Sequence, residues 1–319
     1  MTDSGQNTGA VVIKADGLIK SFPGVRAVDG LSLYVRAGEI FGLVGPDGAG
    51  KTTTLRMLAG ILPPDAGQAS VAGCDVVRNP EQAKHALSYM PQRFGLYEDL
   101  SVDENIRFYA DLYGVRRADR EKRSAELLHA AGMSEFRSRL AGKLSGGMKQ
   151  KLCLVCALIH RPKVILLDEP TTGVDPVSRR DFWRILYELV AEGVAILTST
   201  AYLDEAERCH RVALMHQGKL LFCDTPANLK TRLGKDVVAV TAAEPRVLRS
   251  VLEHTEGASS LVLTGDGVHI VVDNAAQRVP EIEAHLKNAG ILFDSIQKIT
   301  PTIEDLFVDA VSGGGSVRG

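Results

Sequence analysis

Apolar and polar residues alternate from Val11 to about Leu43, as in the segment Gly30–Arg36, which reads Gly-Leu-Ser-Leu-Tyr-Val-Arg. Alternation with a period of two predicts antiparallel strands that bury one face. The pattern then changes to a continuous apolar run at Glu39–Val44, followed after a short gap by the helix-like segment Thr53–Leu58. We therefore expect a buried strand, a short loop and a helix in this order.

Further along, residues of roughly 85–145 are expected to be mainly helical, because Ser101–Glu104 is a capping box that precedes apolar residues at helix spacing. Residues 164–220 return to alternating strands and helices, which is typical of a parallel sheet covered by helices. These two regions and the alternating N-terminal part predict one large α/β domain.

A second domain is expected beyond a boundary near Arg232–Lys235. Its predicted elements are strand Val237–Thr241, helix Pro245–His254, strand Ser260–Thr264, strand Val268–Val272, helix Gln277–Gly290 and strand Ile296–Ile299. The Asp-Gly turn between the second and third strands indicates a hairpin, and the order β-α-β-β-α-β is ferredoxin-like. Since no catalytic constellation is found here, we interpret this domain as a dimerisation or regulatory module.

The predicted organisation has four parts. They are a flexible N-terminal segment (1–10), a large domain (11–232) with its helical subdomain at about 85–145, an α+β accessory domain (235–311) and a Gly/Ser-rich tail (312–319). The tail resembles a linker, which is compatible with truncation from a longer protein.

Composition excludes several classes of function. A formal net charge of -2 provides no basic field for nucleic acid. No apolar stretch is long enough to cross a bilayer, and the polar start is not a signal peptide. We therefore expect a cytoplasmic chain, so that any work at a membrane needs another subunit to supply the span. Cys153 and Cys156 form a C-x-x-C that could suggest a metal or redox site, but they lie in an apolar helical run and are interpreted as core.

The gap between the buried strand and its helix has the sequence Gly45-Pro-Asp-Gly-Ala-Gly-Lys51-Thr52, which matches the phosphate-binding (Walker A) pattern G-x-x-x-x-G-K-[ST]. Glycines let consecutive backbone N–H groups approach phosphate oxygens, and the helix adds its positive end. Lys51 is expected to reach the β- and γ-phosphates and Thr52 to hold Mg²⁺. The residues assigned to this nucleotide site are Gly45, Pro46, Asp47, Gly48, Ala49, Gly50, Lys51, Thr52 and Thr53.

Two carboxylates follow the apolar run Val164–Leu167. Parallel strands present their C-terminal ends at the ligand crevice. Asp168 is therefore expected to hold Mg²⁺, through water, and Glu169 to act as general base. Ordinary solvated charges are the alternative interpretation.

The segment Leu144-Ser145-Gly146-Gly147-Met148-Lys149-Gln150 begins a helix with a hydroxyl cap and two small residues. Together with the motifs above, in the same order over residues 11–230, it resembles the signature of the ATP-binding cassette (ABC) family. The resemblance implies a P-loop NTPase ABC cassette with a RecA-like core, antiparallel β and helical subdomains, and a small ferredoxin-like C-terminal domain. Within this family the chain resembles the ATP-binding subunits of ABC-2-type exporters, which include drug-efflux systems.

The resemblance also implies roles. Two cassettes, identical or different, would pack head to tail, with Ser145, Gly146 and Gly147 touching the γ-phosphate bound by the other cassette. Phe22 would stack on adenine, unless it is a core aromatic. Gln92 would sense Mg²⁺ and the attacking water. Asp175 would communicate between the two sites and can cap a helix at the same time.

The same resemblance predicts that Phe94, Leu96 and Tyr97 form a groove for a helix of an integral membrane permease, although core packing explains these residues equally well. ATP and Mg²⁺ are the implied cofactors, and the implied location is the cytoplasmic face of the cell membrane. A non-transport ABC ATPase, which usually carries two cassettes or a long inserted arm, is a weaker alternative.

One position departs from the family pattern. The histidine expected after the strand Val194–Thr200 is replaced by Ala201, which cannot donate a hydrogen bond. Nearby, His210 is expected to lie along the following helix. We therefore keep a second hypothesis, that of a regulatory ATP-binding half with weak or no hydrolysis.

Overall fold

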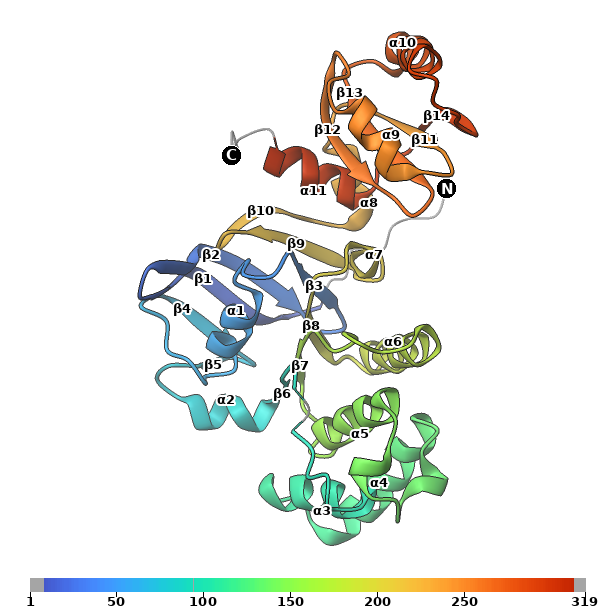
Figure 1. Ribbon diagram of the computed structural model, residues 1–319. Helices are drawn as coiled ribbons and strands as arrows, with labels where there is room; N and C mark the ends of the chain where they lie inside the picture. Colours follow the sequence, from blue (N-terminus) through green and yellow to red (C-terminus); the bar gives the residue numbers. More distant parts are fainter. Residues whose placement is uncertain (1–8, 94, 313–319) are drawn as a thin grey trace. The chain divides into compact units, whose positions relative to one another are not determined.

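The computed structural model describes residues 9–93 and 95–312, so most of the predicted N-terminal segment and C-terminal tail lies outside the described residues. The chain forms two compact units, which Figure 1 draws in sequence colours. One comprises the residues up to Tyr202 together with Cys209–Leu220, and the other comprises Leu203–Arg208 and the residues from Leu221 onward. This division falls earlier than the boundary predicted near Arg232–Lys235.

The first unit begins with an antiparallel sheet of order β2-β1-β4-β5. Its strands are β1 (Val11–Phe22), β2 (Val25–Arg36), β4 (Ala66–Val71) and β5 (Cys74–Asp75). Because alternate residues of β1 and β2 are buried, the antiparallel prediction for this region is confirmed.

A second sheet of order β10-β9-β3-β8-β7-β6 carries the core of this unit. It contains β3 (Ile40–Val44), β6 (Leu87–Met90), β7 (Val164–Asp168), β8 (Ala195–Thr200), β9 (Arg211–His216) and β10 (Lys219–Asp224). The pairs β6–β7, β7–β8, β8–β3 and β3–β9 are parallel. All residues of β3, β7 and β8 are buried, which explains the apolar runs of β3 and β7.

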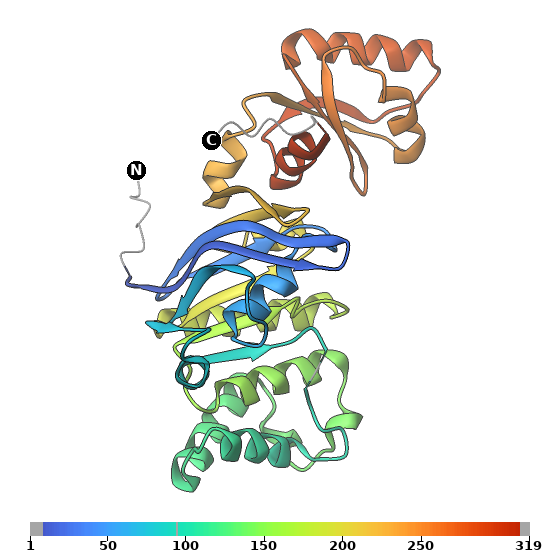
Figure 2. The same ribbon diagram turned by 90° about the vertical axis from the view of Figure 1, so that its left-hand side faces the viewer.

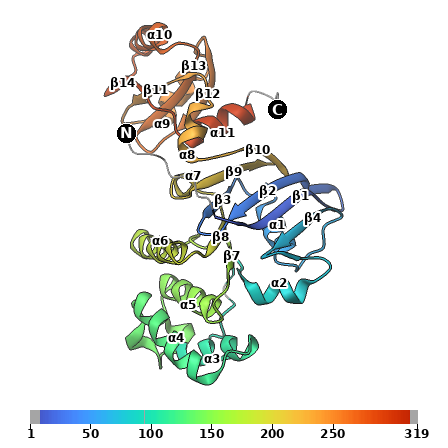
Figure 3. The same ribbon diagram turned by 180° about the vertical axis from the view of Figure 1, so that it is seen from behind.

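The helices of this unit are α1 (Lys51–Leu58), α2 (Pro80–Ala86), α3 (Val102–Leu112), α4 (Arg117–Ala130), α5 (Gly146–Leu158) and α6 (Pro176–Ala191), with short 3-10 turns at Ser134–Phe136 and Ala141–Lys143. Helices α1, α5 and α6 pack on the sheet, and α3 and α4 pack on α5. Figures 1 and 3 show α1 and α6 on opposite faces of the sheet, and Figure 2 shows α3, α4 and α5 gathered at one end of the unit. The prediction that residues of roughly 85–145 are mainly helical is confirmed by α3 and α4. The strand β6 at the start of this range was not predicted, because four residues are too few to show a strand period.

The predicted capping box is confirmed, since the Ser101 side chain accepts from the Glu104 N–H and the Glu104 carboxylate accepts from the Ser101 N–H. In the described residues, no helix is both long and apolar enough to cross a membrane.

The second unit is built on an antiparallel sheet of order β12-β13-β11-β14. Its elements are α7 (Leu203–Ala206), α8 (Pro226–Thr231), β11 (Asp236–Thr241), α9 (Pro245–Leu252), β12 (Ala258–Leu263), β13 (Gly267–Val272), α10 (Ala275–Asn288), β14 (Ser295–Ile299) and α11 (Ile303–Ser312). This order confirms the ferredoxin-like prediction and its hairpin at the Asp-Gly turn.

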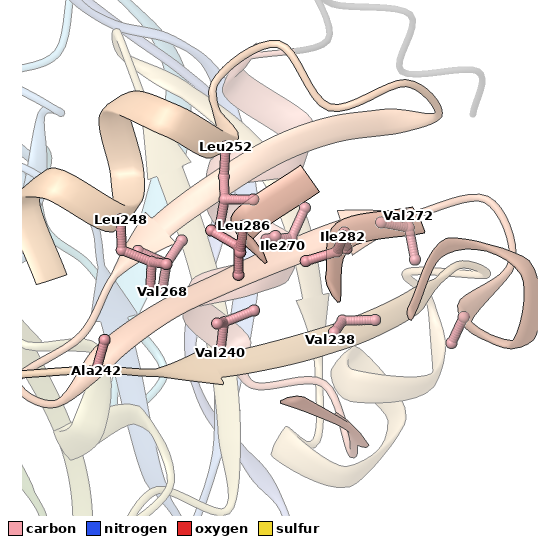
Figure 4. Close-up of a cluster of buried hydrophobic side chains, with 11 residues drawn as sticks. Val238, Val240, Ala242, Leu248, Leu252, Val268, Ile270, Val272, Ile282 and Leu286 are labelled. Carbon is pink, nitrogen blue, oxygen red and sulfur yellow. The ribbon is translucent and has the colours of Figure 1, made fainter. Parts of the chain in front are cut away.

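Figure 4 shows the core of this unit, in which side chains from β11 and β13 meet those of α9 and α10. The terminal helix α11, which was not predicted, contacts β12 and also α7 and α8. Because α7 and α8 pack on α11, they belong to this unit and move its boundary toward the N-terminus.

Candidate functional site

The predicted phosphate loop connects β3 to α1, as the pattern required. Gly50 precedes α1 with φ 102°, and a Cβ there would lie 2.3 Å from the Ala27 carbonyl oxygen. A Cβ on Gly45 would lie 2.2 Å from the Met215 carbonyl oxygen. Glycine is therefore required at both positions. Since no side chain caps α1, its first N–H groups remain available for an anion.

Lys51 is buried at the start of α1, with 4% of its side chain exposed. Its ammonium donates to the carbonyl oxygens of Gly45 at 2.7 Å and Pro46 at 3.0 Å, and lies 3.1 Å from Glu169 Oε1. The loop thus holds a buried cation whose neighbours are two carbonyls and one carboxylate. A phosphate oxygen is the kind of acceptor that such a cation binds.

Asp168 ends β7 and accepts hydrogen bonds from three hydroxyl groups. Thr52 Oγ1 donates to Oδ1 at 2.9 Å and Ser199 Oγ donates to the same oxygen at 2.8 Å. Tyr89 OH donates to Oδ2 at 3.1 Å. Burial, followed by the Asp168 charge, raises the pKa of Tyr89 to about 12, so this phenol stays protonated and donating. The alternative that Asp168 is a solvated charge is wrong, since it is 1% exposed.

Glu169 directly follows β7 with φ 49°, a left-handed conformation in which non-glycine residues are uncommon. Its N–H donates to Ser199 Oγ at 3.0 Å. Its Oε2 accepts from Gln92 Nε2 at 3.0 Å and from Thr172 Oγ1 at 3.4 Å. The carboxylate is thereby held between Lys51 and Gln92, the two residues predicted to act with it.

The structure therefore brings Lys51, Thr52, Gln92, Asp168 and Glu169 together from three segments of the chain. The Thr52 hydroxyl and the Asp168 carboxylate form a hard oxygen pair, which is the donor chemistry that Mg²⁺ prefers. Among the residues described, no group of three or more His, Cys, Asp or Glu side chains forms a metal cluster. A Mg²⁺ ion would thus need further oxygens from a nucleotide or from water.

Phe22 ends β1 and is 41% exposed, so the core interpretation of this aromatic is wrong. The Lys20 ammonium lies 5.9 Å from its ring centroid.

The signature segment lies at the start of α5, where Ser145 Oγ accepts from the Met148 N–H at 3.3 Å. This confirms the predicted cap. The two glycines differ in their surroundings. A Cβ on Gly147 would lie 2.3 Å from Ser178 Oγ, whereas a Cβ on Gly146 would meet nothing within 4 Å. Gly147 thus packs against α6, while Gly146 borders open space.

Asp175 caps α6, because its Oδ1 accepts from the N–H groups of Val177 at 3.1 Å and Ser178 at 2.9 Å. The hydrogen bonds from Ser178 lower the pKa of Asp175, which keeps it ionised at the positive end of the helix. The predicted capping role is confirmed by this geometry.

Ala201 follows β8, and the Gly45 N–H donates to the preceding carbonyl, that of Thr200, at 3.3 Å. The alanine therefore lies beside the phosphate loop. His210 was wrongly predicted to lie along the next helix. It precedes β9 instead, and its Nδ1 accepts from the Ile40 N–H at 3.0 Å, which ties the starts of two parallel strands together.

Tyr97 is 48% exposed and packs edge-on against Phe108, with ring centroids 4.6 Å apart. Phe108 is itself 39% exposed, so this pair presents aromatic surface beside α3. Leu96 is half-buried, and Phe94 lies outside the described residues.

The pair Cys153 and Cys156 is buried within α5, as the core interpretation predicts. Burial raises the pKa of the Cys153 thiol to about 12, so the reactive thiolate is disfavoured.

Sequence reasoning missed Ser199, Tyr89 and Thr172. Ser199 connects the Asp168 carboxylate to the backbone N–H of Glu169. The signal for it was the polar end of β8, Thr198-Ser199-Thr200, in an otherwise apolar strand. Strand ends of one parallel sheet meet at one edge, so this polar end could have been assigned to the site.

Comparison with known proteins matches residues 28–172 to the family described as ABC transporter. The chain is 45% identical over 310 residues to the probable multidrug ABC transporter ATP-binding protein YbhF of Escherichia coli (strain K12), covering 96% of this chain and 53% of that protein. It thus spans about half the length of that relative. It is 35% identical to the daunorubicin resistance ATP-binding protein DrrA2 of Streptomyces coeruleorubidus, with 93% of this chain and 94% of that protein covered.

Among solved structures, one described as the ATP-binding subunit of an ABC transporter is 30% identical and superimposes with a TM-score of 0.65. The match covers 70% of this chain and 93% of that structure.

Proposed function

Because this chain belongs to the ABC transporter family and has the ABC cassette fold, we propose that it is the ATP-binding subunit of an exporter, hydrolysing ATP to drive transport by a membrane permease. The observation that carries the proposal is the contact of Lys51 with Glu169 at 3.1 Å, because it places a phosphate-binding cation beside a candidate base. The export direction is supported by the relatives' names, which refer to multidrug transport and daunorubicin resistance.

Binding of ATP is proposed to change the partner of Lys51. In the structure the ammonium pairs with Glu169. A γ-phosphate carries more negative charge than a carboxylate and would take over this ammonium. The Glu169 carboxylate would then be free to accept a proton while Gln92 Nε2 still holds Oε2.

Hydrolysis then uses Glu169 as general base and Gln92 to orient the attacking water. Thr52 and Asp168 would hold Mg²⁺, which supplies charge neutralisation at the β- and γ-phosphates when bound. Phe22, exposed at the end of β1, would stack on the adenine.

A second cassette, identical or different, is proposed to complete the site. In support, Gly146 borders open space at the helix start that carries Ser145, so a nucleotide held by a partner cassette has room to approach. Gly147 lies beside Asp175, the residue that caps α6, and this pair would transmit contact with the partner cassette to the rest of the chain.

The decisive experiment is steady-state Mg-ATPase activity of the full chain beside Glu169→Gln. Glu81→Gln, at an exposed carboxylate of α2, is the matched control. We expect the first substitution to abolish turnover and preserve ATP binding, and the control to behave as the unchanged chain. Turnover that survives Glu169→Gln would refute the assignment of the base.

The membrane partner is proposed to dock at the aromatic surface of Tyr97 and Phe108, at the cytoplasmic face of the membrane. Tyr97→Ala should weaken recruitment to membranes that contain the permease and leave ATP binding intact. Tyr187→Ala, an exposed tyrosine of α6, serves as control. Equal recruitment of both variants would contradict this docking site.

A regulatory subunit with little hydrolysis is the second candidate, and Ala201 favours it. The residue lies beside the phosphate loop and offers a methyl group where the family places histidine. Hydrogen bonds to developing charge are worth about a hundredfold or more in rate. Ala201→His should therefore raise turnover, whereas unchanged or lower turnover would count against this explanation.

A further inference from the structure

A basic cavity lies at the end of β7 that is opposite to the phosphate loop. Its volume is about 480 Å³, and its lining includes Arg123 of α4 and the loop Arg161–Lys163 that precedes β7. A neighbouring cavity of about 380 Å³ shares Arg123 and Arg161. Asp168 ends the same strand, about 13 Å away at about 3.3 Å per residue. The cavity is therefore separate from the nucleotide site.

Positive charge dominates this cavity. Arg123, Arg161 and Lys163 line it, and the carboxylate of Glu192 is the acidic group in its lining. Within the part of the chain that the structure describes, Arg161 and Lys163 have no ion-pair partner. Even with Glu126 balancing Arg123, the cations Arg161 and Lys163 outnumber the carboxylate of Glu192, and a bound anion would neutralise this excess.

Arg123 is the cation with the greatest need of an acceptor. Its side chain is only 17% exposed, its contact with Glu126 Oε2 is long at 3.5 Å, and its Nε is buried without a hydrogen-bond partner. By contrast, Arg116 in the neighbouring cavity is 86% exposed and pairs with Asp119 at 2.9 Å. A buried donor without an acceptor is unfavourable, and an ion from outside the chain is one way to satisfy it.

The backbone of Arg161 is strained, because φ is 57° at a residue that is not glycine. Its N–H donates to Leu158 O at 3.1 Å, and the Lys163 N–H donates to Ala86 O at 2.8 Å, so the loop is fixed. Strained residues of this kind concentrate at functional sites. His160 beside it is not a further cation, since burial lowers its pKa.

We propose that this cavity binds a phosphoryl anion, held by the guanidinium groups of Arg123 and Arg161 and the ammonium of Lys163. Arginine forks match the oxygens of a phosphoryl group, and lysine adds a compact charge. The bound anion would join α4 of the helical segment to the loop that leads into β7. A soluble phosphate compound and a phospholipid headgroup share this chemistry.

The test titrates the full chain calorimetrically with inorganic phosphate, in the presence of Mg²⁺ and a non-hydrolysable ATP analogue that fills the phosphate loop. The variant is Arg161→Gly with Lys163→Ala, since glycine removes the charge and also relieves the strain. The control is Lys122→Ala, which removes an exposed cation of α4 outside both cavities. We expect phosphate binding to weaken about tenfold or more in the double variant and to be unchanged in the control.

A second arm measures co-sedimentation with phosphatidylglycerol vesicles and with phosphatidylcholine vesicles. If the unchanged chain binds phosphate and the double variant does not, the ligand is a soluble phosphate compound. If the unchanged chain binds only phosphatidylglycerol vesicles and the double variant does not bind them, the ligand is a phospholipid headgroup. Lack of binding to both probes overturns the proposal, as does equal binding by the double variant. If the double variant unfolds, Lys163→Ala alone, at an exposed side chain, carries the same comparison.

Discussion

Ser199 connects the Asp168 carboxylate to the backbone of Glu169 in the nucleotide site, so Ser199→Ala tests how that geometry is maintained. The fully buried hydroxyl donates to Asp168 Oδ1 at 2.8 Å and accepts from the Glu169 N–H at 3.0 Å. A hydrogen bond to a charged acceptor contributes about 1.5–3 kcal/mol, and a buried N–H without an acceptor costs about 1–3 kcal/mol. Because the Glu169 N–H is only partly buried, we take the lower end of each range, so that Ser199→Ala lowers the free energy of unfolding by about 2.5 kcal/mol.

A loss of this size should lower the unfolding midpoint by about 5–10 °C, at about 2–4 °C per kcal/mol for a unit of this size. Circular dichroism during heating measures the midpoint. We also expect kcat for Mg-ATP to fall about tenfold with little change in KM, because Glu169 loses its backbone anchor while Lys51 keeps its carbonyl partners.

Thr198→Val is the matched control for this substitution. Thr198 neighbours Ser199 in β8 and is 1% exposed, and within the described residues its hydroxyl has no hydrogen bond. If Ser199→Ala shifts the midpoint no more than this control and leaves kcat intact, Ser199 does not order the carboxylates and the reasoning fails.

Three further predictions concern other parts of the chain. Gly147→Ala should lower the free energy of unfolding by about 1–3 kcal/mol, because the added methyl group overpacks against Ser178. Gly146→Ala should leave the stability measured by calorimetry unchanged and reduce only ATP hydrolysis. Equal stability of the two variants would contradict the difference in packing. Phe22→Ala should raise the Kd for ATP about tenfold in a fluorescence titration, without a change in the unfolding midpoint, and an unaltered Kd would remove this ring from the site. The hydrogen bond that His269 donates to the Asp305 carboxylate raises the pKa of His269. Burial by itself would raise the pKa of Asp305, but the hydrogen bonds that Asp305 accepts from His269 and Thr302 outweigh it and lower that pKa. The stability that this pair contributes to the C-terminal unit should therefore be lost as the pH rises through the raised histidine pKa, and also as the pH falls through the lowered aspartate pKa. Thermal melts from pH 3 to 9 should show the unfolding midpoint falling at both the acidic and the alkaline end of this range. His269→Gln should remove the fall at the alkaline end.

Much of the fold could be predicted because its signals are local. The burial of every residue in β3 and β7 requires continuous apolar runs, and the turn at Gly50 requires a residue without Cβ, so both are visible in adjacent letters. The same holds for the hairpin in the C-terminal unit, which an Asp-Gly pair indicates. Each of these features depends on neighbours along the chain.

The parts that escaped prediction depend on strand order. The role of Ser199 follows from β8 lying beside β7, and that of Tyr89 from β6 lying on the other side, and neither neighbour is stated by local sequence. His210 was misplaced for the same reason, since its bond to Ile40 exists only because β9 pairs with β3. Hydrogen bonds between strands that are distant in sequence thus form the part of the site that pattern reading leaves out.

The contact between Lys51 and Glu169 also bears on the two candidate functions. While Lys51 lies 3.1 Å from this carboxylate, the ammonium competes with water for the lone pairs that a base would use. In the proposed mechanism, a phosphate therefore has to displace Glu169 from Lys51 before the carboxylate accepts a proton. Ala201 does not contribute to that exchange, because a methyl group offers neither charge nor hydrogen bond. ATP binding and release of the base should consequently survive the loss of the histidine, and any deficit that Ala201 causes should appear in kcat and leave the Kd for ATP unchanged.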